Sequence, residues 1–468
     1  MATNVSILDR SLRVFTDMRA GEGATALLMF ANVFLILCAY YFIKPLREGW
    51  ISISDIGGLT KVEIKAYSSF AQSAFLIPVV WAYGRLSERW NRRRLITYAT
   101  LFCMAHMVVF WTLQPDFFFA NLPYTGIIFY LWVGMFGVFV VAQFWAFAAD
   151  VYAGESGDRL LPFIAIGATS GAASGAWITG ALLQSEIMRT EWLLLAALIP
   201  LTISICLTRI VDQRRPHPQR AKHPSRPADT RSGPSTLGLI FSSRFLLPTA
   251  IITILLSWVN TNGENLLFRV LQTFLETEAV SQGITGSDAL RLYTRDATTS
   301  FYSDFFFWVN IAALLLQAFA ASRLLKYGGF GVLFLMMPVV ALLSYSTMAL
   351  VPVLLIVKVM KIAENATDYS INNTARHVLW LPLDAEAKYK GKPAIDSLFV
   401  RIGDGIAALT ILIGVGLLAL PTPYFFMLNI ILVIIWIVFA IVVIREHGYL
   451  IQADAAEQAY SLDSAGGS

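Results

Sequence analysis

The sequence predicts an all-α membrane protein with about twelve transmembrane helices, arranged as two sets of six. Of its 468 residues, 57% are hydrophobic and only 14% are charged. This composition excludes a water-soluble globular domain of the ordinary kind. Apolar runs long enough to cross a hydrocarbon layer of about 30 Å as helices recur along the chain. A polar, basic stretch separates the sixth run from the seventh.

The apolar runs define the expected order of the helices. The first six spans are predicted at 24–43, 64–83, 95–113, 122–148, 160–183 and 191–210. The segment that follows them, VDQRRPHPQRAKHPSRPADTRSGPST, is rich in Arg, Lys, Pro and Ser and is typical of a solvated linker. The last six spans are predicted at 246–268, 302–325, 332–350, 353–375, 396–419 and 424–444. We therefore expect an N-terminal six-helix half at 1–210, a basic cytoplasmic linker at 211–240, a C-terminal six-helix half at 241–445 and a cytoplasmic tail at 446–468.

The distribution of basic residues predicts the orientation, because Lys and Arg collect in cytoplasmic loops. Basic residues precede the first span, follow the second, fill the central linker and occur again near 323–326 and 388–392. The opposite loops QPDFFFAN and PTP contain no Lys or Arg. Both termini are therefore expected to be cytoplasmic.

The loop between the second and third spans, YGRLSERWNRRRL at 83–95, resembles the loop signature of the major facilitator superfamily. In that family the loop latches the cytoplasmic ends of neighbouring helices through charge pairs. The resemblance implies a cytoplasmic latch formed by Gly84, Glu88, Arg89 and Arg93. A plain positive-inside anchor with chance spacing is the alternative. A weaker echo, SRLLKYGGFGVL at 322–333, is consistent with two related halves, which are common among secondary transporters.

Charged side chains inside the predicted spans indicate a functional interior, since each costs at least about 2.5 kcal/mol at mid-membrane unless it faces a partner or a wet cavity. In the first span, Lys44 and Arg47 share one helix face, with Glu48 beside them. The tenth span carries a polar stripe. Its members are Lys358, Lys361, Asn365, Asp368 and Asn372, with Glu364 alongside.

Two further spans end in polar groups. In the seventh, WVNTNGENLLFR, Asn260, Glu264 and Arg269 surround Gly263, which we expect to weaken the helix. The fourth span ends at Asp150. A structural interpretation remains open: residues near span ends, such as Arg47, Glu48 and Asp150, can extend to the interface, and Glu364 and Asp368 can pair with the lysines of their own helix.

Sequence similarity suggests a family for the chain. The stretch YSINNTARHVLWLPLDAEAKYKGKPAIDSLFVRIGD at 369–404 resembles the signature of the ATP/ADP translocases, the nucleotide transporters of plastids and obligate intracellular bacteria and their less characterised relatives in free-living bacteria. Its most specific part is LPLDAEAKYKGKPAID. FIKPLRE, FWAFAADVYAGESGDRLLPFIAIGA and VNTNGENLLFR resemble the first, fourth and seventh spans of that family. The bacterial members imply a multi-pass protein of the inner membrane.

The resemblance also implies roles for individual residues. Arg47 occupies a position where the translocases have a functionally required Lys. Asp150 occupies the position of a required Glu, and Glu264 matches a second required Glu. Lys390 or Lys392 matches a required basic residue. The chain departs from the family pattern at Pro45 and Leu46, where the translocases have polar residues, and Asp150 is one methylene shorter than Glu; the scaffold is therefore better supported than the substrate.

The predicted function is secondary active transport of an anionic, phosphorylated metabolite, with a nucleotide as first candidate, in exchange mode and by alternating access. The expected substrate-binding residues are Lys44, Arg47, Lys358, Lys361, Asn365, Asn260 and Arg269. The expected coupling or gating residues are Glu48, Asp150, Glu264, Glu364, Asp368, Arg401 and Asp404. A proton-coupled porter or exporter of another solute is one alternative, and a non-transporting membrane scaffold or sensor is another.

The sequence contains no phosphate-cradling GxxxxGK[ST] motif, so we expect gradients or exchange to drive transport and do not expect an enzyme. No cofactor, metal or nucleic acid is expected. The expected partners are the small anion, the lipid bilayer and a proton or counter-substrate. The exact substrate, the direction, the coupled species, the oligomeric state and the role of Lys390 and Lys392 do not follow from the sequence.

Overall fold

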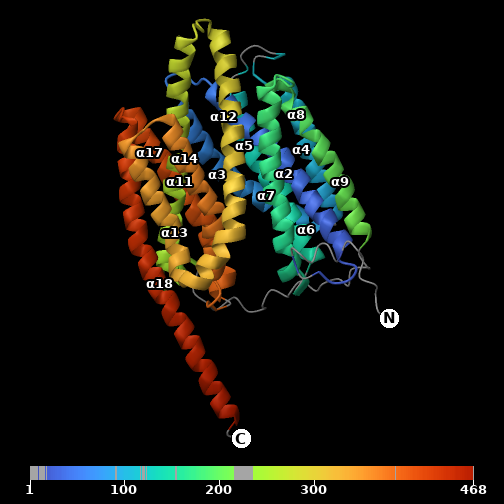
Figure 1. Ribbon diagram of the computed structural model, residues 1–468, viewed down its shortest axis with the longest axis vertical. Coiled ribbons are helices and arrows are strands. Elements are labelled where there is room, and N and C mark those ends of the chain that lie inside the picture. The colour runs from blue at the N-terminus through green and yellow to red at the C-terminus, as the bar shows by residue number, and fades with distance from the viewer. Residues whose placement is uncertain are drawn as a thin grey trace. The chain divides into compact units, whose positions relative to one another are not determined.

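Helices form the regular structure in the part of the chain that the computed structural model describes (Figure 1). It describes residues 18–89, 92–115, 124–152, 155–214, 236–384 and 386–466, together with residues 9, 16, 117, 118 and 122. The side chains at 87, 88, 92, 93, 155, 158 and 454–466 are outside this description. Contacts divide the chain into an N-terminal unit, Met1–Ala221 with Leu271–Leu314, and a C-terminal unit, Lys222–Val270 with Leu315–Ser468.

The helices of the N-terminal unit follow the predicted spans. They are α2 (Gly23–Ser52), α3 (Lys61–Arg89), α4 (Arg92–Leu113), α5 (Thr125–Phe136), α6 (Gln143–Val151), α7 (Glu155–Gln184), α8 (Leu193–Ala196), α9 (Leu198–Gln213) and α12 (Ser287–Leu315). A π-helical turn, Gly137–Ala142, joins α5 to α6, and a short 3₁₀ turn, Thr190–Trp192, precedes α8. The part of α11 that follows Val270 forms a long hairpin with the start of α12, yellow in Figure 1.

Close packing of α2 against α7 organises the core of the N-terminal unit. Gly167, Gly171 and Gly175 line one face of α7 at a spacing of four. A Cβ atom on Gly171 would lie 2.2 Å from the carbonyl oxygen of Phe34, and one on Gly175 would lie 2.4 Å from that of Cys38. The run GATSGAASGAWITG therefore brings two backbones together, as small residues do at membrane helix interfaces.

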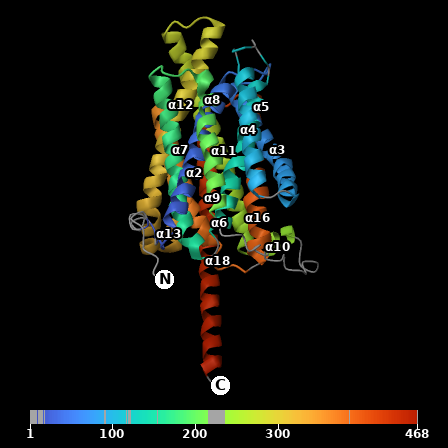
Figure 2. The same ribbon diagram turned by 90° about the vertical axis from the view of Figure 1, so that its right-hand side faces the viewer.

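The C-terminal unit contains α11 up to Val270 and the remaining helices. They are α10 (Thr236–Ser242), α11 (Leu246–Ser281), α13 (Ser322–Leu350), α14 (Leu354–Thr367), α15 (Asn373–Leu379), α16 (Lys392–Ala394), α17 (Val400–Ile411) and α18 (Thr422–Gly466). Five π-helical turns link them at 316–321, 368–372, 387–391, 395–399 and 412–417. Helix α13 packs against α14 and α18. Figure 2 shows α18 continuing as a single long helix to the C-terminus.

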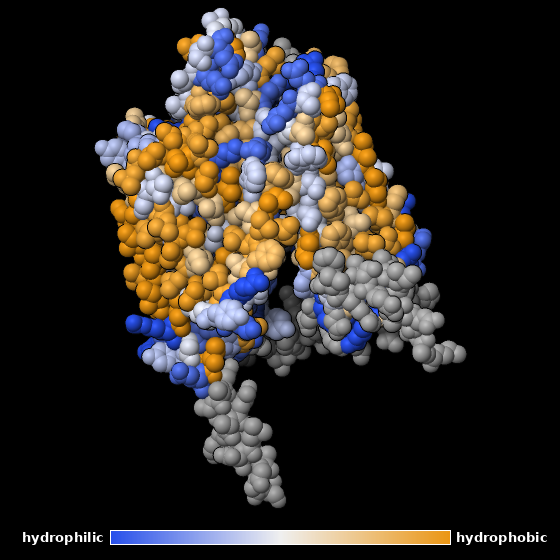
Figure 3. Space-filling model, in the orientation of Figure 1, coloured by the Kyte–Doolittle hydropathy of each residue, from blue (hydrophilic) through white to orange (hydrophobic). Residues whose placement is uncertain are grey.

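Nine helical segments among the described residues are long and apolar enough to cross a membrane. One of them, Ser287–Leu350, contains two predicted spans, because Gly329 breaks it with a φ of 71°. The helices α3 and α14–α15, which hold the predicted second and tenth spans, are not among these nine segments. In Figure 3, apolar side chains cover most of the height of the visible face of each unit, and hydrophilic ones gather at its ends. The chain is a multi-pass membrane protein.

Two helix positions differ from the sequence-based expectation. Helix α11 runs without interruption through Gly263, where the sequence predicts a weak point. That glycine provides space instead: a Cβ atom there would lie 2.1 Å from the hydroxyl oxygen of Tyr345 and 2.8 Å from Nζ of Lys361. All three cysteines lie in apolar runs, which predicts that they are small core residues; Cys38 and Cys103 are buried, but Cys206 is exposed on α9.

Candidate functional site

The charged residues near the end of α2 form one buried cluster with α3. Glu48 accepts a hydrogen bond from Nε of Arg47 at 3.0 Å, and its other carboxylate oxygen lies 2.9 Å from Nζ of Lys65. The side chains of Glu48 and Lys65 are only 2% and 3% exposed. A carboxylate that contacts two cations offsets part of the free-energy cost of removing all three charges from water. We call Arg47, Glu48 and Lys65 the α2–α3 charge cluster.

Aromatic rings surround the cations of α2. The guanidinium carbon of Arg47 lies 4.3 Å from the ring centroid of Tyr130 on α5. Nζ of Lys44, one turn earlier, lies 4.0 Å from the ring centroid of Phe306 on α12 and 5.1 Å from that of Tyr41. Such cation–π contacts stabilise a charge without neutralising it. Aromatic rings from α2, α5 and α12 therefore line the positions of the two basic side chains.

A second buried cluster lies in the C-terminal unit, between α11, α13 and α14. Nζ of Lys361 is 2.9 Å from Glu364 and 3.7 Å from Glu264, and both Lys361 and Glu364 are fully buried. The hydroxyl of Tyr345 donates to Glu364 at 3.0 Å. Asn365 donates to Glu264 at 2.8 Å, so the polar stripe of the tenth span faces the end of the seventh.

This second cluster, which we call the α11–α14 cluster, joins residues predicted for two different roles. Asn260, predicted for substrate binding, has its side-chain oxygen 3.5 Å from Nζ of Lys361. Glu264 is 28% exposed, whereas its partner Lys361 is not exposed at all. Glu264 is therefore the carboxylate of the cluster through which a solute or a proton can approach.

The remaining predicted residues lie in other settings. Asp368 accepts a hydrogen bond from Asn372 at 2.7 Å, and Arg269 donates to the carbonyl of Leu420 at 3.1 Å. These hydrogen bonds link Asp368 and Arg269 to groups outside both clusters. Lys358 is half-buried on α14, and Asp150 is exposed at the end of α6.

Asp404 joins α17 to α11. Its carboxylate accepts hydrogen bonds from Ser257 at 2.7 Å, from Thr261 at 2.9 Å and from Arg401 at 3.0 Å. Two hydroxyls from adjacent turns of α11 and one guanidinium hold the carboxylate in place. This geometry is consistent with a structural link between α11 and α17, and it is also consistent with the predicted gating role.

The predicted cytoplasmic latch is described only in part. Gly84 and Arg89 lie in the last turns of α3, where Arg89 is exposed. The side chains of Glu88 and Arg93 are outside the described residues. At the start of α2, outside the apolar span, Glu22 accepts two hydrogen bonds from the guanidinium of Arg159, at 3.1 and 3.2 Å. This pair ties the start of α2 to the start of α7.

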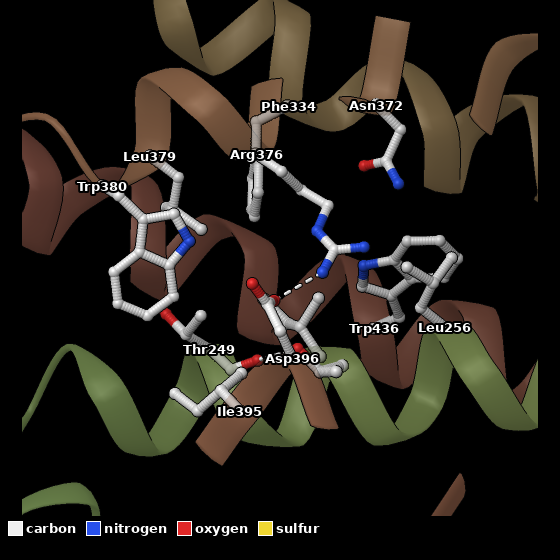
Figure 4. A pocket seen from close by; sticks show the side chains of 12 residues that line it. Thr249, Leu256, Phe334, Asn372, Arg376, Leu379, Trp380, Ile395, Asp396 and Trp436 are labelled. Carbon is white, nitrogen blue, oxygen red and sulfur yellow. Dashed lines mark hydrogen bonds and ion pairs between the residues drawn. The ribbon is translucent and has the colours of Figure 1, made fainter. Parts of the chain in front are cut away.

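A small recess in the C-terminal unit is lined by two charged residues of the sequence signature, Arg376 and Asp396 (Figure 4). Arg376 on α15 points to Asp396, which also accepts a hydrogen bond from Lys392 at 2.6 Å. Trp380 and Trp436 flank this group on opposite sides in the figure. Lys390, by contrast, pairs with Glu386 at 2.8 Å. Lys392 rather than Lys390 is thus the signature lysine that lies at the recess.

Sequence reasoning missed three residues that the structure places in or near the clusters. Lys65 lies inside the predicted second span, so its charge alone would have marked it. Tyr345 had no such signal, because a tyrosine in an apolar run is usual in membrane helices. Arg295 was also missed; it is 2% exposed and pairs with the buried Glu191 at 2.8 Å. Its position in α12, before the predicted span at 302–325, hid its burial.

Among the described residues, no group of three or more His, Cys, Asp or Glu side chains is placed to hold a metal ion. The clusters therefore offer cations, carboxylates, amides and hydroxyls as ligand-contacting groups. This set can bind an anion, exchange one ion-pair partner for another, or accept a proton at a carboxylate.

Comparison with known proteins gives partial matches in sequence. Residues 325–447 match the family model described as "TLC ATP/ADP transporter". The ADP,ATP carrier protein 1 of Chlamydia pneumoniae is 25% identical over 165 residues, which are 30% of this chain and 32% of that protein. The chain thus spans about a third of the length of the curated relative it matches.

Solved structures provide the fold. The nucleoside transporter NupG superposes with a TM-score of 0.58 at 14% identity, covering 90% of this chain and 98% of its own. A point mutant of the same transporter gives 0.59 at 13% identity, covering 92% and 99%. At this identity the likeness shows the fold alone, which is that of the major facilitator transporters. The predicted resemblance to the ATP/ADP translocases is therefore confirmed over residues 325–447, in a chain that has the major facilitator fold.

Proposed function

We propose that this protein is a secondary transporter that exchanges anionic, phosphorylated metabolites across a membrane by alternating access, with nucleotides as the first substrate class. The observation that carries the proposal is the α2–α3 charge cluster. A buried ammonium, a partly buried guanidinium and their aromatic neighbours lie on helices of a transporter fold. Guanidinium and ammonium groups bind phosphate through charge-assisted hydrogen bonds. The family match at 325–447 supports nucleotides over other phosphorylated anions.

The α11–α14 cluster supports a coupling role beside substrate binding. Lys361 contacts two carboxylates, those of Glu264 and Glu364. Opening one of these ion pairs would free a cation for the substrate or a carboxylate for a proton. The cluster thus has two carboxylates for one ammonium. This excess of carboxylates is the specific observation that favours the second candidate function, a proton-coupled porter for a different solute.

Thermal unfolding of the purified protein tests the proposal. A ligand that binds only the folded state raises the melting temperature, with about 2.7 kcal/mol of stabilisation at a hundred times its Kd. We expect ATP or ADP to stabilise the parent and to have little effect on Arg47→Ala. Arg323→Ala is the matched control, because Arg323 is exposed and its described contacts are with Phe319, one turn earlier.

The outcomes separate the alternatives. Stabilisation by nucleotides, followed by exchange of radiolabelled nucleotide in liposomes, supports the proposal. Stabilisation by another anion but not by nucleotides would contradict the substrate class and keep the transport mode. Uptake of a solute driven by a proton gradient without counter-substrate would favour the porter. If no solute from a panel of nucleotides, sugar phosphates, NAD and organic anions stabilises the parent, a membrane scaffold or sensor takes the place of the transporter.

A further inference from the structure

Lys65 is the buried lysine of the α2–α3 charge cluster, and the proposed function does not specify its individual role. It lies on α3, at the start of the predicted second span, with a side chain that is 3% exposed. Its ammonium lies 2.9 Å from one oxygen of Glu48, while the other oxygen of Glu48 contacts Arg47. Glu48 therefore stands between a guanidinium and an ammonium that come from two different helices.

The position of Glu48 indicates what the two cations can bind. A carboxylate has two oxygens and one charge, whereas a phosphate group has three free oxygens and between one and two charges near neutral pH. A phosphate can therefore contact Arg47 and Lys65 together and retain an oxygen for another donor. An incoming phosphate and Glu48 compete for the same cations, as like charges cannot share one buried site without a large cost.

Lys65 also reaches α12. Its Nζ lies 3.2 Å from the hydroxyl oxygen of Tyr302, which is completely buried. Two further polar contacts hold α12 to the same unit: Tyr41 donates to Asn310 at 3.4 Å, and Arg295 pairs with Glu191 at 2.8 Å. Of these three attachments of α12, the one through Tyr302 involves a group of the α2–α3 charge cluster.

We infer that Lys65 is a substrate-binding cation for the phosphate group of the transported anion, and that it reports the presence of that anion to α12 through Tyr302. The inference rests on the proposed function in that an anion is transported, but it does not require a nucleotide. When the phosphate replaces Glu48 at the ammonium of Lys65, the donor geometry at Lys65 changes, and the contact with Tyr302 changes with it. Binding in the cluster and the attachment of α12 are thereby linked.

Binding measurements on the full-length protein in lipid nanodiscs test the first half of this inference. The probes are ATP, ADP, pyrophosphate and inorganic phosphate, measured by titration calorimetry. Loss of a charged hydrogen bond predicts that Lys65→Ala binds roughly ten- to a hundredfold more weakly. Lys65→Arg is expected to recover most of the affinity. Lys61→Ala is the matched control, because Lys61 lies one turn away on α3 and donates to the backbone carbonyl of Ser54 at 2.6 Å.

A double variant keeps the test valid if Lys65→Ala fails to fold with Glu48 left beside it. Lys65→Met with Glu48→Gln removes the buried ion pair as a unit and is expected to fold and still bind weakly. The reference for this double variant is Glu48→Gln alone, because removal of the competing carboxylate can itself strengthen binding. Equal affinity in the two variants would overturn the inference, because it would assign Lys65 a purely structural role. If the parent binds pyrophosphate or inorganic phosphate but no nucleotide, and Lys65→Ala weakens that binding, the substrate class fails and the inference stands.

Exchange kinetics in liposomes test the link to α12. Tyr302→Phe removes the hydroxyl and keeps the ring. We expect its Kd for the probe to stay within about twofold of the parent and its maximal exchange rate to fall several-fold. An unchanged rate would overturn the link through Tyr302. If none of the four anions binds the parent, both the proposed function and this inference are contradicted.

Discussion

Glu22 is a charged residue outside the apolar spans whose environment gives a pH dependence. Burial acts to raise its pKa, but hydrogen bonds from Arg159 and from the backbone N–H of Arg19 outweigh this and lower the pKa below its ordinary value of 4.5. A carboxyl with a lowered folded-state pKa contributes stability above its unfolded pKa and loses it as the pH falls through the folded value.

We therefore expect the parent to be more stable than Glu22→Gln at pH 7, by about 1 kcal/mol or less because the pair is partly exposed. The two proteins should converge as the pH falls below 4.5. Melting temperatures between about pH 7 and pH 3.5 measure this. A gap that stays constant with pH would show that the carboxylate of Glu22 does not carry the stabilisation.

At the same scale, the sequence predicts some site residues and not others for identifiable reasons. Arg47, Glu48, Lys361 and Glu364 could be predicted because a charge inside an apolar run has few explanations. The contacts that these residues make with other helices could not be predicted, since they depend on how the helices pack. Tyr345 is the clearest example: it is completely buried and donates to Glu364, yet in the sequence it is one aromatic residue among many.

Among the helices, the glycine face of α7 determines how closely α2 can pack. Gly171→Ala is expected to destabilise the protein by about 1–3 kcal/mol, because its new Cβ would lie 2.2 Å from the carbonyl oxygen of Phe34. Gly180→Ala on the same helix is the matched control. Its nearest atom would be Cβ of Ser303 at 3.7 Å, an ordinary contact, and alanine favours the helix.

Thermal unfolding in detergent measures both variants. Gly171→Ala should melt below the parent, and Gly180→Ala at or above it. If both glycines tolerate alanine equally well, the close approach of α2 and α7 is not maintained in solution.

The helices themselves were more predictable than their irregularities. Apolar runs of this length predict each span because backbone N–H and C=O groups inside a bilayer must form hydrogen bonds within the protein, and a helix satisfies them within one segment. The π-helical turns within the fourth, eighth, tenth and eleventh spans had no signal, because they depend on local packing. The uninterrupted course of α11 through Gly263 also could not be predicted, since neighbouring side chains from α13 and α14 fill the space beside that glycine.

For the whole molecule, the alternation of basic and non-basic ends predicts an orientation that labelling can measure. Basic residues favour the cytoplasmic side. With both termini inside, the connection between α11 and α12 at 282–286 is outside, and the start of α13 is inside. We expect Gln282→Cys to react with a membrane-impermeant maleimide in intact cells and Lys326→Cys to react only after lysis.

Both positions are exposed, so a difference in labelling reports the side of the membrane and not burial. Each variant is made in a Cys206→Ser background, because Cys206 is exposed, whereas Cys38 and Cys103 are buried. Reversed labelling would place the basic linker outside and invert the predicted orientation of the chain. Labelling of both cysteines in intact cells would contradict a single orientation, and the charge distribution would then not set the topology of this chain.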